Sequence, residues 1–325
     1  MNYLFPGDRG TQVEHLQLAL SRAGYPTRVD GIFGRETCGN LQAFLGTKGA
    51  CVANRDVWKK LLPYLKGYVE HTIAEGDSLY RIAREYKTTE QAILTANPLI
   101  DPQDLQVDAV LEIPLGFPLV PENVRYTSEL LSYIVDGLRV RYPFFSVGSI
   151  GRSVMRKELL YLKLGDGPQE VCYNASFHAN ESITTPVLLK FAEEYGEEYA
   201  RALRGEVNSE FPAEELFQRF GLYLIPMVNP DGVDLVNGVL TSGDFYRQAV
   251  RIAADFPDIP FPDGWKANID GVDLNLQFPA SWEEARKIKY AKGYTKPAPR
   301  DYVGMAPLTE PESIAMYEFT REHEF

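Results

Sequence analysis

The sequence is poor in basic residues. The 325-residue chain has 33 Lys and Arg against 45 Asp and Glu, a formal net charge of −12. Binding to nucleic acid needs a basic face, so no nucleic-acid partner is expected. There is no basic amphipathic run for a membrane surface, no apolar run near the ~18 residues of a membrane span, and no signal-peptide pattern at the start. We therefore expect a soluble protein that does not use the general secretory route.

Cysteine and histidine are also scarce. Cys38, Cys51 and Cys172 are an odd, scattered set without CxxC spacing, so we expect buried or incidental thiols rather than a disulfide framework or a cysteine zinc site. Of the four histidines, His15 and His71 have no cysteine or carboxylate at ligand spacing. We expect both to be structural.

Residues 1–66 have the pattern of a small helical domain. Val13, Leu16 and Leu20 lie at three- and four-residue steps, and a second apolar stripe follows Thr37, the expected N-cap of its helix. A third short helix is expected at "RDVWKKLLPYL". The stretches "GDRGTQVEHLQ" and "VDGIFGRET" resemble the three-helix peptidoglycan-binding domain. The resemblance implies binding of wall carbohydrate or stem peptide, although such a domain can also serve only for packing.

Residues 68–115 predict the order strand, helix, helix, strand. Leu79, Ile82 and Ala83 share one helical face, and Thr89 is placed to cap the second helix. With "HTIAEGDSLYRIA" and "LTANP", the segment resembles a LysM domain. The resemblance implies binding to glycans that contain N-acetylglucosamine, such as peptidoglycan.

The third part, residues 116–325, begins with a Pro-rich linker and then alternates helix and strand patterns. Alternation of this kind predicts an α/β domain with a mixed central sheet covered on both faces. Ligands are expected beyond the carboxyl ends of its strands. The chain is therefore predicted to be multidomain: a three-helix domain, a βααβ domain and an α/β domain. The expected helices are 128–143 and 186–203, and the expected strands are 158–165, 170–178 and 220–232.

His178 and Glu181 stand where one of the predicted strands ends. At that place two side chains can converge on one metal ion without disturbing the sheet. The spacing alone is also that of a turn histidine followed by a glutamate that caps the next helix. From these two residues both interpretations stay open.

Four longer stretches, "IGRSVMRKELLYLKLG", "FHANES", "IPMVNPDG" and "WKANIDGVDLNLQFP", resemble the zinc carboxypeptidase family from about residue 123 to the end. The resemblance implies a zinc cofactor with His178 and Glu181 as its first two ligands. It makes Asp273 the carboxylate that holds the ligand histidine's other ring nitrogen, and Lys266 a substrate-binding side chain that stabilises an oxyanion. Taken alone, Asp273 could instead cap a turn, and Lys266 could be a solvated surface lysine.

One departure from the family pattern narrows the expected substrate. The family has Asn-Arg where this chain has Asn275 and Leu276, so Asn275 is kept as a substrate-binding residue but the guanidinium that clamps a terminal carboxylate is lost. Ordinary C-terminal trimming is not expected. With wall-binding modules in front, the chain resembles the bacterial γ-D-glutamyl-diaminopimelate endopeptidases, which implies zinc-assisted hydrolysis of peptidoglycan stem peptides.

The family's third zinc ligand and its general-base glutamate have no counterpart in this sequence. His323 is the only late histidine, and it lies at a predicted helix end before the expected ligand strand. We therefore expect the sequence to be a fragment or a truncated product. The alternative function is that of an inactive protein that binds peptidoglycan. Without a recognised export signal, we expect a cytoplasmic or spore-associated protein that acts on wall material.

Overall fold

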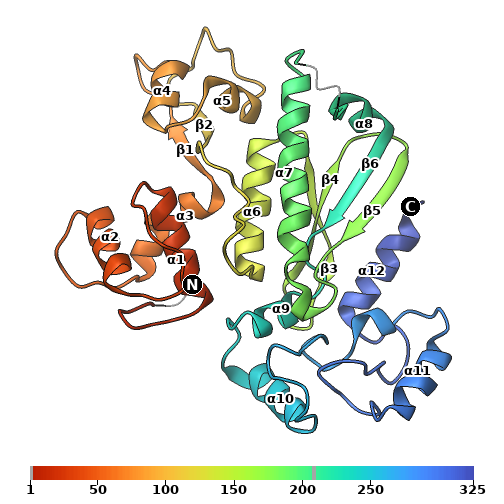
Figure 1. Ribbon diagram of the computed structural model, residues 1–325. Coiled ribbons are helices and arrows are strands. Elements are labelled where there is room, and N and C mark those ends of the chain that lie inside the picture. Colours follow the sequence, from red (N-terminus) through yellow and green to blue (C-terminus); the bar gives the residue numbers. More distant parts are fainter. Residues whose placement is uncertain (1–2, 207–209) are drawn as a thin grey trace. The chain divides into compact units, whose positions relative to one another are not determined.

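The computed structural model describes residues 3–206 and 210–325. The chain divides into two compact units. The first contains Met1–Val124, Ser132–Ser146 and Glu193–Ala213, and the second contains Arg125–Leu131, Val147–Ala192 and Glu214–Phe325. Figure 1 labels the elements along the chain. No helix within the described ranges combines the length and apolar character that spanning a bilayer requires.

Three helices form the start of the first unit, as the sequence predicts. They are α1 (Thr11–Arg22), α2 (Arg35–Leu45) and α3 (Arg55–Lys66). The stripe residues Val13, Leu16 and Leu20 are buried. The predicted N-cap is wrong: α2 begins at Arg35 with Gly34 as its N-cap. Thr37 instead lies buried inside the first turn, where its hydroxyl accepts a hydrogen bond from Gln17 Nε2 at 3.0 Å.

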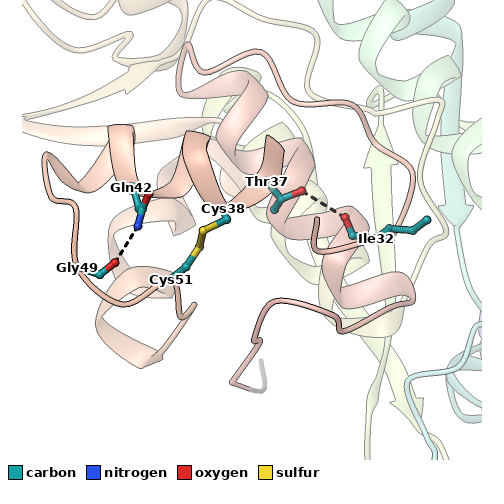
Figure 2. The surroundings of a disulfide bond; sticks show 6 residues. All are labelled: Ile32, Thr37, Cys38, Gln42, Gly49 and Cys51. Carbon is teal, nitrogen blue, oxygen red and sulfur yellow. Dashed lines mark hydrogen bonds between the residues drawn. A yellow bond between two sulfur atoms is a disulfide. The ribbon is translucent and has the colours of Figure 1, made fainter. Parts of the chain in front are cut away.

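The expectation of three free thiols is also wrong, because Cys38 and Cys51 form a disulfide bond (Figure 2). Helix α2 ends at Gly46, whose left-handed conformation reverses the chain. The Gln42 side chain then holds the returning loop by donating to the Gly49 carbonyl at 2.8 Å. The two cysteine Cα atoms come within 5.6 Å, which suits a disulfide. Only the path of this loop brings the two together, so their spacing in the sequence did not reveal the bond.

The predicted strand, helix, helix, strand order is confirmed for the next segment. Its elements are β1 (Tyr68–Thr72), α4 (Leu79–Glu85), α5 (Glu90–Ala96) and β2 (Val110–Pro114), and β1 pairs antiparallel with β2. Leu79, Ile82 and Ala83 lie in its core. Thr89 caps α5 by accepting from the Ala92 amide. His71 lies between Asp77 and Tyr86, 2.9 and 3.1 Å from their side-chain oxygens, and is structural.

The Pro-rich connection that follows is packed rather than loose. Leu119 and Val120 are buried, and Glu193 accepts hydrogen bonds from both of their amides. Arg141 donates to the carbonyls of Leu115 and Phe117 at 2.9 and 2.8 Å. Arg141 and Glu193 come from α6 (Ser128–Arg141) and α7 (Thr184–Ala202). We call residues 115–120 the strap.

The α/β part contains a mixed sheet, as predicted. Its strands are β3 (Ser146–Arg152), β4 (Glu158–Leu164), β5 (Gln169–Asn174) and β6 (Phe220–Ile225), in the order β3-β4-β6-β5. Strand β6 is antiparallel to β4 and parallel to β5. Its nearly continuous burial explains why its sequence is apolar throughout.

The segments that follow the two parallel strands carry short helices near the sheet edge where both strands end. The one-turn helix η1 (Ala179–Glu181) follows β5, and α9 (Pro230–Val236) follows β6. These two helices pack together, and they can do so because Gly232 has no side chain: a Cβ there would lie 2.7 Å from Ala179 Cβ. The remaining elements are α8 (Ala213–Arg219), α10 (Gly243–Ala254), η2 (Leu274–Leu276), α11 (Trp282–Ala291) and α12 (Pro311–Glu322).

Candidate active site

The turn after β5 sets the positions of His178 and Glu181. Ser176 adopts a left-handed backbone conformation, and its amide donates to the Thr184 hydroxyl at 2.8 Å, which closes the turn. His178 is the N-cap of η1 and Glu181 is its last residue. Residues three apart eclipse each other in a 3₁₀ turn, so the two side chains lie on one side. The three-residue spacing therefore brings the His178 and Glu181 side chains together, where both can contact one metal ion.

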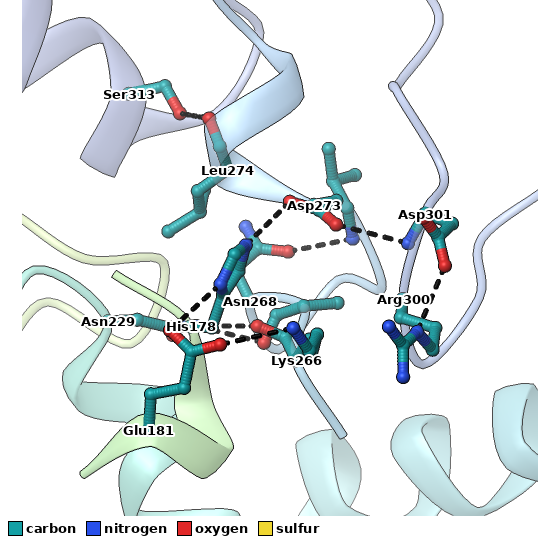
Figure 3. Close-up of polar contacts among 12 residues, drawn as sticks. His178, Glu181, Asn229, Lys266, Asn268, Asp273, Leu274, Arg300, Asp301 and Ser313 are labelled. Atoms are coloured by element: carbon teal, nitrogen blue, oxygen red, sulfur yellow. Dashed lines mark hydrogen bonds and ion pairs between the residues drawn. The ribbon is translucent and has the colours of Figure 1, made fainter. Parts of the chain in front are cut away.

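His178 lies between two carboxylates. Its Nδ1 is 3.1 Å from Glu181 Oε2, and its Nε2 is 3.1 Å from Asp273 Oδ1 (Figure 3). The hydrogen bond to Asp273, together with the charges of both carboxylates, raises the pKa of His178. Because Asp273 is almost fully buried and fixes Nε2, the imidazole presents Nδ1 on the side of Glu181.

Lys266 completes this group from a different part of the chain. Its Nζ is 3.1 Å from Glu181 Oε1. Burial alone would raise the pKa of Glu181, but the hydrogen bonds from Lys266 and His178 lower it, so the carboxylate is ionised. The structure therefore brings His178, Glu181, Lys266 and Asp273 together, as the sequence motifs imply.

The Lys266 backbone is held at several points. Its carbonyl accepts from the Ala179 amide at 3.1 Å, which ties it to η1. The side chain of buried Asn229, the N-cap of α9, donates to the neighbouring Ala267 carbonyl at 2.9 Å. Asn229 belongs to the quoted "NPDG" stretch, but no pattern in that stretch predicts this contact.

Next to Asp273 lies a group of charged residues that the sequence did not predict. The Asp301 amide donates to Asp273 Oδ2 at 3.1 Å. The Asp301 carboxylate in turn forms ion pairs with Lys289 and with Arg300, whose Nε is 2.9 Å from Oδ2. Burial alone would raise the pKa of Asp301, but these two cations lower it. No local pattern in the sequence links residue 301 to residue 273.

Asn275, predicted to bind substrate, and His323, not expected to bind zinc, make no hydrogen bond to the four side chains of the candidate site in the described part of the chain. Asn275 is exposed on η2. His323 lies 3.0 Å from Glu170, near the first residue of β5, whereas His178 follows the end of that strand. A strand rises ~3.3 Å per residue, so His323 is far from His178.

The donor chemistry at His178 and Glu181 fits zinc, which binds imidazole nitrogen and carboxylate oxygen. The second ring nitrogen is held by a carboxylate, as is usual for histidine ligands of metals. Within residues 3–206 and 210–325, no cluster of three or more His, Cys, Asp and Glu side chains is arranged to hold a metal ion. At this place the described side chains offer one imidazole nitrogen and one carboxylate oxygen to a metal ion.

Comparison with known proteins agrees with the motifs. A family model described as zinc carboxypeptidase matches residues 132–325, and the LysM domain model matches residues 71–114. The γ-D-glutamyl-L-diamino acid endopeptidase 1 of Lysinibacillus sphaericus is 38% identical over 306 residues, which cover 78% of this chain and 75% of that protein. The uncharacterized protein YqgT of Bacillus subtilis (strain 168) is 46% identical over 188 residues, 56% of this chain and 46% of that protein.

Solved structures give a weaker likeness. Carboxypeptidase A from Helicoverpa armigera has a TM-score of 0.43 and 18% identity, over 75% of this chain and 50% of that one. The chain spans three quarters of the first relative but about half of YqgT and of the carboxypeptidase A structure.

Proposed function

The chain belongs to the zinc carboxypeptidase family, and from this premise we propose that it is a zinc-dependent endopeptidase of bacterial cell walls. Its proposed substrate is the bond between γ-D-glutamate and the diamino acid, such as diaminopimelate, in peptidoglycan stem peptides. The name of the Lysinibacillus relative, a γ-D-glutamyl-L-diamino acid endopeptidase, supports this choice of bond.

The observation that carries the proposal is the His178–Glu181 pair with Asp273 behind it. We assign the first two as zinc ligands and Asp273 as the residue that orients the imidazole. When bound, zinc supplies Lewis acidity and an activated water. Lys266 is placed next to this pair, where its ammonium can stabilise negative charge on the oxygen of the scissile amide.

The N-terminal modules are proposed to hold the protein on the wall. The match to LysM supports binding to glycans that contain N-acetylglucosamine. The three helices before it are proposed to bind the same polymer. Two weak contacts made together give a higher effective affinity than either alone. Glycan binding and hydrolysis are separate properties, so each can be lost without the other.

The first test is zinc content and hydrolysis measured on the same preparations. With zinc in the buffer, the peptidase proposal expects the wild-type chain to bind zinc and to release a diaminopimelate-containing fragment from L-alanyl-γ-D-glutamyl-meso-diaminopimelate. Glu181→Ala should lose both properties and still sediment with purified peptidoglycan. Glu318→Ala, an exposed change on α12, serves as the matched control.

The outcomes separate the two functions proposed for the chain. Zinc retained by Glu181→Ala would show that the ligand assignment is wrong. If the wild-type chain sediments with peptidoglycan but releases no fragment at any zinc concentration, the chain is a glycan-binding protein and not a peptidase.

A further inference from the structure

Three basic side chains surround the candidate site, and they differ in what they contact. The ammonium of Lys266 is paired with Glu181, and that of Lys289 with Asp301. Arg300 uses only its Nε for Asp301. Within the described part of the chain, its two terminal NH₂ groups have no hydrogen bond or ion pair. The Arg300 side chain is 39% exposed, so part of it is open to a ligand.

The backbone on both sides of Arg300 is bonded to the site. Before it, the Pro299 carbonyl accepts from the amides of Lys266 and Ala267 at 2.8 and 2.9 Å. After it, the Asp301 amide donates to Asp273 Oδ2. Arg300 is thus fixed between the segments that carry Lys266 and Asp273, and Figure 3 shows its guanidinium together with the side chains of the site.

Asp301 also orients the guanidinium. Its Oδ2 accepts from Arg300 Nε at 2.9 Å, while Lys289 is bound to its other oxygen. Asp301 has a φ of 67°, a left-handed conformation that aspartate tolerates better than most residues. Because Nε is already held, the side chain loses less rotational freedom when it binds a ligand.

We propose that Arg300 binds a carboxylate of the substrate next to the scissile amide, an inference that rests on the proposed function. A guanidinium presents two parallel N–H groups that match the two oxygens of a carboxylate. The site also holds the carboxylates of Glu181, Asp273 and Asp301, which repel an anionic substrate unless a cation faces it.

The proposed substrate offers carboxylates on both sides of the bond. A γ-linked glutamyl residue keeps its α-carboxylate free, close to the scissile carbonyl, and the diamino acid carries carboxylates on the other side. The carboxylates on the two sides of the bond have the same hydrogen-bonding chemistry. Amidation of one carboxylate at a time removes its charge and identifies the group that Arg300 contacts.

The test is calorimetric binding of four peptides to the zinc-loaded chain, each N-methylated at the scissile amide so that it is not cleaved. The peptides are L-alanyl-γ-D-glutamyl-meso-diaminopimelate, its glutamyl α-amide and its two diaminopimelate monoamides. Arg300→Ala is expected to weaken binding of the unmodified peptide by about tenfold to a hundredfold, since a hydrogen-bonded charge pair is lost. It should also abolish the wild-type preference for one of the carboxylates over its amide. Arg300→Lys keeps the charge but not the two parallel N–H groups, so its affinity for the unmodified peptide should lie between those of wild type and Arg300→Ala.

Controls distinguish the possible failures. Arg247→Ala changes an exposed arginine on α10 and should bind like wild type. Zinc content and thermal midpoint should be unchanged in Arg300→Ala, which establishes that it is folded and loaded. If wild type binds none of the peptides, the proposed function itself fails. If wild type binds and discriminates, but Arg300→Ala does so equally well, the assignment of Arg300 is wrong and the proposed function stands.

Discussion

At the scale of single residues, Glu312 is the buried acid with the clearest consequence. It lies in the first turn of α12 with no exposed surface. Its carboxylate accepts from the Val154 amide at 3.1 Å and lies 3.4 Å from Asn268 Nδ2. Burial, and to a smaller extent the charge of Asp231, raises the pKa of Glu312 to about 7. Glu312 therefore holds its proton more tightly in the folded state than in the unfolded state.

This shift predicts how stability depends on pH. Because the folded state binds the extra proton, the contribution is fully present below the ordinary pKa of 4.5 and is lost as pH rises toward about 7. Glu312→Gln, which cannot ionise, should be more stable than wild type at pH 8 by up to about 3 kcal/mol and similar at pH 4.5. Urea unfolding from pH 4.5 to 8 measures the difference. Parallel profiles for wild type and Glu312→Gln would contradict the raised pKa of Glu312. Glu318→Gln, an exposed control on the same helix, should be as stable as wild type at both pH values.

The cysteines give a second prediction at this scale. In denatured but unreduced protein, a thiol reagent should find one thiol, Cys172, and three after reduction, because Cys38 and Cys51 are bonded. In the native state Cys172 should react slowly, since burial raises its pKa to about 11. Three thiols without reduction would contradict the disulfide. Disulfides persist in oxidising surroundings, so the same titration on protein from its native cells also tests the expected cytoplasmic or spore location.

At the scale of helices and strands, the N-caps of α9 and α5 can be compared directly, because in each a side chain accepts from an amide in the first turn. Asn229 is fully buried; it caps α9 and also donates to the Ala267 carbonyl beside Lys266. Thr89 makes the same kind of cap on α5, where its hydrogen bond is exposed. Thr89→Ala should cost about 1 kcal/mol, the usual value of a cap. Asn229→Ala should cost about 2 to 4 kcal/mol, because it also leaves a buried carbonyl unsatisfied.

Urea unfolding measures both costs, and zinc retention separates them further. Asn229→Ala should weaken zinc binding. The Asn229 side chain helps to hold the Lys266 carbonyl, and this carbonyl accepts from the Ala179 amide of η1, the helix that carries Glu181. Thr89→Ala should leave zinc binding unchanged. Equal effects of the two variants would show that Asn229 is only a helix cap.

The elements were more predictable from the sequence than their ends and contacts. Apolar periodicity predicts α1, α4 and the buried strand β6, because each buries one face or all of itself. The motifs also bring His178 and Asp273 together correctly. The disulfide, the N-cap of α2 and the position of Arg300 depend on where loops return, and periodicity carries no information about that. Arg300 is adjacent to Asp301, which contacts Asp273 only because of the path of the segment before α12.

At the scale of the whole molecule, the contacts of the strap decide whether the connection after the LysM domain is a flexible linker or a packed segment. Its contacts with Arg141 and Glu193 all lie within the first unit. The Glu193 side chain is buried and that of Arg141 is only 12% exposed, and their charged atoms are 3.7 Å apart. Removal of one member of a buried pair leaves the other charge uncompensated, so this pair should be far more sensitive to substitution than an exposed pair.

Arg141→Met is therefore expected to release the strap. It removes the donors to the Leu115 and Phe117 carbonyls and the ion pair between Arg141 and Glu193. Chymotrypsin should then cut the variant after Leu115 and Leu119 at least about tenfold faster than wild type, because cleavage needs a locally open backbone and follows the free energy of opening. Arg139→Met, two residues earlier on α6 at a half-exposed ion pair, should be cut at the wild-type rate. Rapid cleavage of wild type after Leu115 or Leu119 would mean that the connection is a flexible linker, as its proline content alone suggests, and that the contacts of the strap do not hold it.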